Sequence, residues 1–313
     1  MTQLRNERPI RLGIVGVGKI ARDQHLPAIA ANPSFELVAT ASPGTRLDGV
    51  PGYDDIASLL EGGHDLDAVS ICTPPAGRHE IAAVAIGAGL HAMLEKPPAA
   101  SLSEVADLEA RAVAARTTLF AAWHSREAAG VDSAREWLAD RQIVAARIAW
   151  KEDIRRWHPG QEWILGAGGF GVFDPGINAL SILTAILPDR VMVEAAQMEV
   201  PKGRASPIAA RLTLKSGGAQ VDAVFDFLQT GPQNWDIEVD TDLGTLTLAM
   251  GGSILTLPGE AAVEGPDREY ARLYARFATL IREAACDVDV APLRLVADAF
   301  LLGERQEVAS FAF

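Results

Sequence analysis

The ten residues LGIVGVGKIA (12–21) decide the fold expected for this chain. The apolar start suits a buried parallel strand, and the pattern G-x-G-x-x-A follows directly at residues 16–21. In such a strand–turn–helix unit, Gly16 permits the tight turn, Gly18 lets the backbone approach a pyrophosphate, and Ala21 allows close packing of helix on strand. An ordinary glycine turn is the alternative. The predicted dinucleotide contacts in this turn are Gly16, Gly18, Lys19 and Ile20.

The rest of the N-terminal part repeats this unit. Short apolar strands are expected at residues 37–41, 68–72, 91–94 and 118–122, with helices at 20–31, 80–88 and from Ser101 onward. Such alternation predicts right-handed crossovers and an α/β fold of the Rossmann type, a doubly wound parallel sheet covered on both faces. Residues 1–124 are therefore predicted to form a dinucleotide-binding domain.

The pattern changes after His124. Helices are expected near residues 131–139, 176–187, 270–284 and 292–305, and strands at 144–153, 191–200, 208–214, 220–227, 235–240, 244–249 and 253–257. Gly, Pro and Asp separate these strands, which is typical of a large open, mainly antiparallel sheet. Residues 125–313 are thus predicted to form an α+β domain for substrate binding and oligomerisation.

Composition narrows the class of protein. The chain has 313 residues, is 49% hydrophobic and carries a net charge of -13, which argues against nucleic acid or an anionic membrane as the main partner. No apolar run approaches the length of about 18 residues that a membrane span needs. Residues 1–8 lead into the first strand without the apolar region of a secretory signal. The two cysteines, Cys72 and Cys286, form no disulfide or metal motif, so no metal is expected. The sequence predicts a cytoplasmic enzyme.

A second decisive stretch is HAMLEKPP (91–98). Proline cannot continue a central strand, so this strand must end near Lys96. Ligands bind at the carboxyl edge of an open α/β sheet, and a lysine there can transfer a proton. The alternative is a solvated lysine at the start of a loop.

The end of the second strand bears on the choice of cofactor. An NAD-specific site usually has Asp or Glu there for the ribose 2′-hydroxyl, and residues 41–46 contain neither. Ser42, Thr45 and Arg46 could instead hold a 2′-phosphate, although a plain polar loop is the alternative. We therefore expect NADP, or dual use of NADP and NAD with NADP slightly favoured.

Other residues near the ends of these strands are further candidates. Thr73-Pro74-Pro75 could lie along the cofactor or merely terminate a strand. His79 and His124 could be contacts or structural histidines.

Two polar stretches stand out in the second half. KEDIRRWHP (151–159) combines carboxylates, imidazole and indole, which polyol recognition requires, although a solvated strand end is the default for such a run. Asp174 and Asn178, four residues apart, share the first turn of an expected helix. Alternatively, Asp174 only caps that helix.

Together, the motifs at residues 16–21, 95–97 and 174–178 resemble those of the glucose–fructose oxidoreductase / inositol dehydrogenase (Gfo/Idh/MocA) family. The resemblance covers essentially the whole chain. The stretches 18–28, 123–126, 150–159 and 168–181 are similar to those of bacterial aldose 1-dehydrogenases for L-arabinose and D-galactose. The family often has His where this chain has Asn178, which argues against a histidine acid–base at that position.

The resemblance implies a site and a reaction. Lys96 and Asp174 would be catalytic, acting singly or as a coupled pair on the reacting hydroxyl. The implied sugar contacts are Lys96, Glu152, His158, Asp174 and Asn178. The implied cofactor neighbours are Glu95, Lys96, His124, Trp157 and Trp163. The expected reaction is oxidation of the anomeric carbon of an aldose to the aldonolactone. Another sugar or inositol dehydrogenase of the family and a non-catalytic NAD(P)-binding regulator are the alternatives. Because the expected helices cover only one face of the second sheet, a homodimer is predicted.

Overall fold

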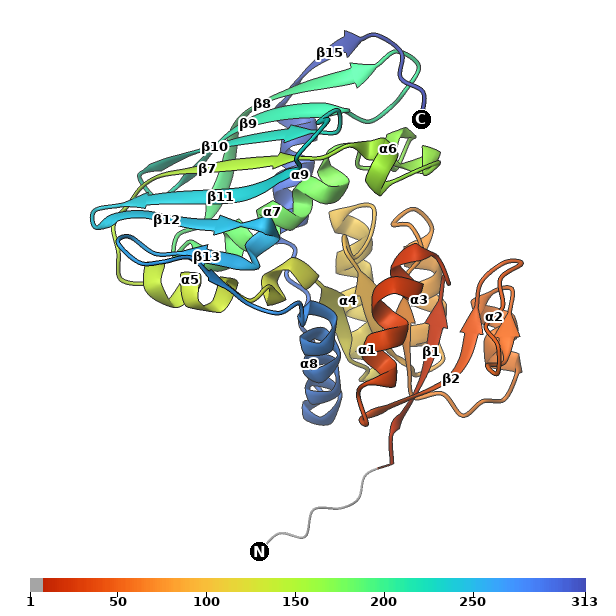
Figure 1. Cartoon of the computed structure of the whole chain (residues 1–313). Coiled ribbons are helices and arrows are strands. Elements are labelled where there is room, and N and C mark those ends of the chain that lie inside the picture. Colours follow the sequence, from red (N-terminus) through yellow and green to blue (C-terminus); the bar gives the residue numbers. More distant parts are fainter. Residues whose placement is uncertain (1–7) are drawn as a thin grey trace, which may run out of the picture. The chain divides into compact units, whose positions relative to one another are not determined.

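The computed structural model describes residues 8–313 and divides into two compact units (Figure 1). Residues 1–7, on which most of the expectation about a secretory signal depends, lie outside the described residues. The first unit runs to Ala122 and also takes in Tyr270–Asp289. The second comprises Trp123–Glu269 and Val290–Phe313. Within residues 8–313, no helix is both long and apolar enough to cross a membrane, and no group of three potential metal ligands occurs.

The first unit contains a six-stranded parallel sheet in the order β3-β2-β1-β4-β5-β6. This is the strand order of the doubly wound dinucleotide-binding fold, so the predicted fold is confirmed. The strands are β1 (Ile10–Val15), β2 (Phe35–Ala41), β3 (Gly52–Tyr53), β4 (Ala68–Ile71), β5 (His91–Glu95) and β6 (Leu119–Ala122). The helices are η1 (Ala21–His25), α1 (Leu26–Ala30), α2 (Ile56–Glu61), α3 (Arg78–Gly87) and α4 (Leu102–Ala115).

Two buried clusters form the core, one on each face of this sheet. Because side chains alternate along a strand, Leu12 and Ile14 face the first cluster and Val15 faces the second. The second cluster also contains residues of α2, α3 and α4. The first cluster also contains residues of α1 and of α8 (Glu269–Glu283), a helix from the C-terminal half of the chain.

Helix α8 departs from the linear division at residue 124. Its apolar stripe carries Tyr274 and Phe277, both fully buried in the first unit. The Phe277 ring stacks with Phe35 and Phe120 at centroid distances of 6.0 and 6.1 Å. An amphipathic helix must bury its apolar stripe, and this stripe is buried against the parallel sheet. The functions assigned to the two domains remain predictions.

The second unit contains a nine-stranded sheet, ordered β14-β13-β12-β11-β7-β10-β9-β8-β15. Only β7 with β10 and β8 with β15 pair in parallel, so the sheet is mainly antiparallel, as predicted. The strands are β7 (Ile143–Lys151), β8 (Val191–Pro201), β9 (Ala209–Ser216), β10 (Ala219–Asp226), β11 (Asn234–Thr241), β12 (Gly244–Ala249), β13 (Ile254–Thr256), β14 (Val263–Glu264) and β15 (Glu304–Val308). The sequence pattern missed β14 and β15 in this sheet, and β3 and α2 in the first unit.

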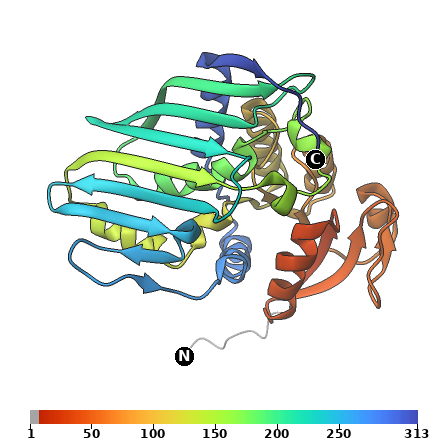
Figure 2. The same cartoon turned by 45° about the horizontal axis from the view of Figure 1, so that its top comes forward.

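Helices α5 (Val131–Leu138), α7 (Phe173–Ile186) and α9 (Ala291–Leu302) lie on one side of this sheet (Figures 1 and 2). Phe173 of α7 contacts Phe225 of β10 at 5.6 Å and Phe300 of α9 at 5.5 Å between ring centroids. A Cβ on Gly176 would lie 2.8 Å from the Phe225 ring, so a glycine is needed for α7 to approach β10 this closely. The remaining short helices are η2 (His124–Glu127), α6 (Ile154–Trp157), η3 (Glu162–Leu165) and η4 (Met250–Gly252).

Candidate functional site

The glycine turn after β1 is closed on one side and open on the other. Gly16 has φ +92°, and a Cβ there would lie 2.8 Å from the Thr73 backbone nitrogen. A Cβ on Gly18 would meet nothing within 4 Å. The Thr73 hydroxyl beside this turn is buried and has no hydrogen-bond partner among residues 8–313. Helical structure begins at Lys19. The pyrophosphate of a dinucleotide would fit here, because the site combines a tight turn, an accessible backbone, an unpaired hydroxyl and a helix N-terminus.

The structure brings Ser42, Thr45 and Arg46 together in one turn after β2. Arg46 Nη1 donates hydrogen bonds to the carbonyl oxygens of Ser42 at 3.2 Å and Thr45 at 2.9 Å. Arg46 Nη2 lies 2.9 Å from Asp54 Oδ1, an ion pair that sequence reasoning missed because Asp54 follows the next strand.

Arg78, at the start of α3, ties two of the predicted site stretches together. It is almost fully buried, and its guanidinium donates to the carbonyl oxygens of Thr73, Glu95 and Pro97. A buried cation of this kind must be paired, and here three backbone carbonyls satisfy it. Sequence reasoning missed Arg78, since an arginine at a helix start gives no distinguishing signal.

His79, which was predicted to contact the cofactor, packs against the neighbouring helix. Its Nε2 lies 2.7 Å from Asp107 Oδ2 of α4, and its side chain is about one-fifth exposed. This contact agrees with the alternative of a structural histidine, and its proximity to the cofactor stays a prediction.

A buried network holds the strand end that carries Lys96. Glu95 Oε2 accepts a hydrogen bond from the Lys96 backbone N–H at 2.9 Å. Glu95 Oε1 accepts one from the Tyr270 hydroxyl at 2.6 Å and lies 3.0 Å from His25 Nε2. His25 Nδ1 in turn lies 2.8 Å from the Tyr274 hydroxyl. Helix η1, which follows the glycine turn, strand β5 and helix α8 therefore meet at the carboxylate of Glu95.

The charge state of this network follows from its surroundings. Burial lowers the pKa of His25, but Cys72, Tyr274 and Glu95 outweigh it and hold this pKa well above 6.5. We attribute most of the effect at neutral pH to Glu95, because a thiol and a phenol are then un-ionised. Burial raises the pKa of Tyr274 to about 12, so its hydroxyl remains a hydrogen-bonding group. The network thus contains an ionic pair, Glu95 with His25, inside the core.

In the second unit, α7 carries Asp174 in its first turn and Asn178 one turn later. Asp174 is buried and Asn178 half-buried. The helix is capped by Val172 without a side-chain hydrogen bond, so Asp174 is not the capping residue. The chain enters the helix through a glycine-rich turn, in which a Cβ on Gly171 would lie 2.2 Å from the Pro207 carbonyl oxygen. A carboxylate in the first turn is favoured by the helix dipole.

A second cluster lies where β7 ends. The buried Glu152 has Oε1 3.0 Å from His158 Nε2, and its Oε2 accepts a hydrogen bond from Trp235 Nε1 at 3.0 Å. The predicted pair of Glu152 and His158 is therefore in contact. Trp235, on the paired strand β11, was missed because only strand register reveals this proximity.

Of the aromatic candidates in this unit, Trp157 lies at the same strand end. Trp157 packs edge-on against Trp235 at 5.2 Å between ring centroids, and its Nε1 donates to Gln233 Oε1 at 3.2 Å. Trp163 is half-buried in η3. His124 Nδ1 lies 2.5 Å from Glu269 Oε2, a carboxylate that sequence reasoning did not single out.

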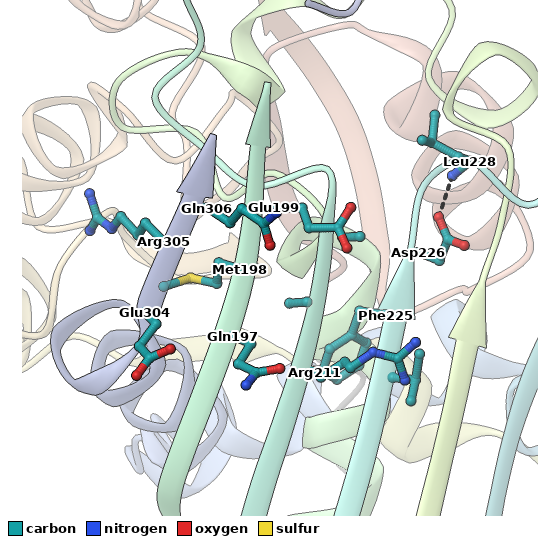
Figure 3. Close-up of a pocket in the computed structure, with 13 residues that line it drawn as sticks. Gln197, Met198, Glu199, Arg211, Phe225, Asp226, Leu228, Glu304, Arg305 and Gln306 are labelled. Atoms are coloured by element: carbon teal, nitrogen blue, oxygen red, sulfur yellow. Dashed lines mark hydrogen bonds between the residues drawn. The ribbon is translucent and has the colours of Figure 1, made fainter. Parts of the chain in front are cut away.

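The residues predicted to form the active site are thus divided between the two units. Lys96 and the glycine turn belong to the first unit, whereas Glu152, His158 and Asp174 belong to the second. A groove of about 360 Å³ on the nine-stranded sheet contains none of these residues (Figure 3). It lies on the face opposite α7, where Arg211 and Glu199 alternate with buried residues along β9 and β8.

Over nearly its whole length, the chain is similar to known sugar dehydrogenases. The family model "Oxidoreductase family, NAD-binding Rossmann fold" (GFO_IDH_MocA) matches residues 10–122. The galactose 1-dehydrogenase of Pseudomonas fluorescens is 44% identical over 97% of this chain and 99% of its own. The crystal structure of D-galactose-1-dehydrogenase from Rhizobium etli superposes with a TM-score of 0.94 at 52% identity, over 98% of this chain and 99% of that one. A 3-ketoreductase from Actinomadura kijaniata, in complex with TDP-benzene and NADP, shares the fold at 19% identity (TM-score 0.81, covering 96% and 99%).

Substitutions in the glycine turn should separate folding from cofactor binding. Gly18→Ala should keep the wild-type unfolding free energy but weaken NADH binding about tenfold or more, because the methyl group occupies the space that the pyrophosphate needs. Gly16→Ala should cost about 1–3 kcal/mol of stability through its positive φ and the clash with Thr73. Denaturant titration and NADH fluorescence measure the two effects. Unchanged NADH affinity in Gly18→Ala would contradict the assignment.

Removing His25 should destabilise the chain in a pH-dependent way. The folded pKa of His25 is raised, so its contribution is fully present below 6.5 and is lost as the pH rises through the folded value. His25→Gln should therefore cost about 2–4 kcal/mol near pH ~6 and less near pH ~9 in urea unfolding. His64→Gln is the control, since the half-buried His64 contacts the Tyr53 hydroxyl and, within residues 8–313, no carboxylate. A pH-independent difference for His25→Gln would exclude the ionic pair.

Proposed function

Because this chain belongs to the Gfo/Idh/MocA oxidoreductase family, we propose that it is an aldose 1-dehydrogenase that oxidises D-galactose, L-arabinose or both to the aldonolactone. The observation that carries the proposal is 52% identity to a D-galactose-1-dehydrogenase over nearly the full length of both chains. The Glu152, His158 and Trp235 cluster supports it, since it joins a carboxylate and an imidazole with an aromatic surface of the kind that binds sugars.

The proposed reaction removes a hydride and a proton from the anomeric carbon and its hydroxyl. A nicotinamide dinucleotide held at the glycine turn of residues 16–21 would supply the hydride acceptor. Lys96 accepts the hydroxyl proton, alone or coupled to Asp174, and the C1–O bond becomes the carbonyl of the lactone. Asn178, on the same helix face as Asp174, hydrogen-bonds the sugar. Glu152 and His158 orient the remaining hydroxyl groups.

The two sugars differ little in what the protein can recognise. D-galactose and L-arabinose share the arrangement of hydroxyl groups at ring carbons 2 to 4 and differ by a hydroxymethyl group. Loss of such a small group usually costs only about 1–3 kcal/mol in specificity. We therefore propose that one site accepts both.

For the cofactor, we propose dual use of NADP and NAD with NADP slightly favoured. The family binds a nicotinamide dinucleotide through its Rossmann domain. The finer preference is supported by the position of Arg46, which is half-exposed in the turn after β2 and can reach a 2′-phosphate. Thr73, Pro74 and Pro75 would border the cofactor from the end of β4, with His124, Trp157 and Trp163 as its proposed neighbours in the second unit.

We also propose that the protein is a homodimer whose second copy covers the open face of the nine-stranded sheet. That face carries charges of both signs, Arg211 with Glu199 and Asp226, so two identical copies of it could pair opposite charges about a two-fold axis (Figure 3). A monomer in light scattering at micromolar concentration would contradict it. The expected cytoplasmic location stays a prediction.

A plate assay tests the function directly. Reduced nicotinamide should accumulate with D-galactose and L-arabinose, and more slowly or not at all with D-glucose, D-xylose and myo-inositol, with both NAD and NADP. Activity confined to D-glucose or myo-inositol would show that the proposed substrate is wrong but that the protein is still a dehydrogenase. Absence of turnover with every sugar would contradict the proposal and favour the regulator.

Kinetics of two variants test the proton-transfer groups. Lys96→Ala should lower kcat by about 10²–10⁴ while NADH still binds, because a general base is lost. A comparable loss in Asp174→Asn would indicate a coupled pair, and a much smaller loss would assign the base to Lys96. Lys202→Ala, at an exposed turn after β8, is the matched control. Near-normal turnover of Lys96→Ala would exclude its role.

A further inference from the structure

We propose that Asp54 determines how the protein distinguishes NAD from NADP. Its carboxylate would bind the ribose 2′-hydroxyl, in place of the acidic residue that is missing at the end of β2. The inference rests on the cofactor part of the proposed function and deepens it. It concerns the first unit alone.

The position of Asp54 follows from strand pairing. Strand β3 runs parallel to β2, with Tyr53 opposite Ala41, and the Ser42 backbone N–H donates to the Tyr53 carbonyl at 2.8 Å. Asp54 is the next residue, so it lies beside Ser42 at the carboxyl edge of the sheet. In dinucleotide-binding sheets this edge, at the end of the second strand, is where an acid meets the ribose 2′-hydroxyl.

The turn of residues 42–46 is built around the Asp54 carboxylate. Asp54 Oδ1 accepts hydrogen bonds from the Gly44 backbone N–H at 3.2 Å and from Arg46 Nη2 at 2.9 Å. These contacts lower the pKa of Asp54, so it is ionised at neutral pH. Its side chain is two-thirds exposed and open to a ligand.

Arg46 is held in place by the same turn. Besides its pairing with Asp54, Nη1 donates to the carbonyl oxygens of Ser42, Thr45 and Tyr53. The side chain passes over Gly52, where a Cβ would lie 2.4 Å from Arg46 Cδ. These contacts hold the guanidinium next to the Asp54 carboxylate.

The pair therefore has opposite effects on the two cofactors. The 2′-hydroxyl of NAD can donate to the carboxylate of Asp54. The 2′-phosphate of NADP gains from Arg46, but it is repelled by the adjacent carboxylate, which already uses part of the arginine's hydrogen-bonding capacity. Asp54 thus limits a preference for NADP that Arg46 alone would produce, which explains dual use from one turn.

Binding titrations without sugar test this inference. NADH and NADPH are titrated against the full chain and followed by nicotinamide fluorescence. Asp54→Asn should shift the ratio of the two dissociation constants about tenfold toward NADPH, and Arg46→Gln should shift it toward NADH. The matched control is Asp48→Asn, which removes one negative charge from the same loop. The Asp48 side chain is exposed and makes no hydrogen bond or ion pair within residues 8–313.

The outcomes separate the inference from the function on which it rests. An unchanged ratio in Asp54→Asn, or an equal shift in Asp48→Asn, would overturn the role of Asp54 while cofactor binding stands. Failure of the wild-type chain to bind either reduced cofactor would remove the proposed function and this inference with it. If Asp54→Asn fails to fold, as shown by circular dichroism, the Arg46→Gln titration decides alone: no shift toward NADH overturns the pairing.

Discussion

The first unit depends on one buried carboxylate, that of Glu95. Removing a charge from water is costly unless hydrogen bonds and an opposite charge compensate it, and breaking such a pair typically costs about 3–5 kcal/mol. Here His25, Tyr270 and the Lys96 amide supply the compensation. Since these groups come from the glycine-turn helix, α8 and the strand end, each of the three elements is held in register with the others.

A comparable constraint organises the strand end of β7 in the second unit. Glu152 is buried and satisfied by an imidazole and an indole that come from different segments of the chain. Both carboxylates lie at strand ends, where backbone direction changes and side chains from several elements converge. This arrangement makes rigid, polar sites on an otherwise apolar core, which is how binding groups are held in a productive geometry.

Much of the fold could be predicted from local pattern. The glycine motif and the spacing of apolar runs correctly predicted five of the six strands of the parallel sheet, because a strand buried on both faces reads as a short apolar run. The two-residue strand β3 was missed. The errors at β15 and α8 have the same cause, because the sequence does not show which strand or surface an element packs against. Strand β15 consists of mostly exposed polar residues, and its pairing with β8 is invisible in the sequence. The apolar stripe of α8 was evident, but not the surface that buries it.

The sequence by itself determined the class of fold, the location of the glycine turn, and the residue types at residues 95–97, 151–159 and 174–178, since each depends on short-range pattern. Only the tertiary structure decided which side chains meet. Asp54 reaches Arg46 because β3 pairs with β2, Trp235 reaches Glu152 because β11 pairs with β7, and Tyr270 reaches Glu95 across 175 residues of sequence. Hydrogen bonds between distant residues follow from strand register and helix packing, and a single sequence carries no direct record of either.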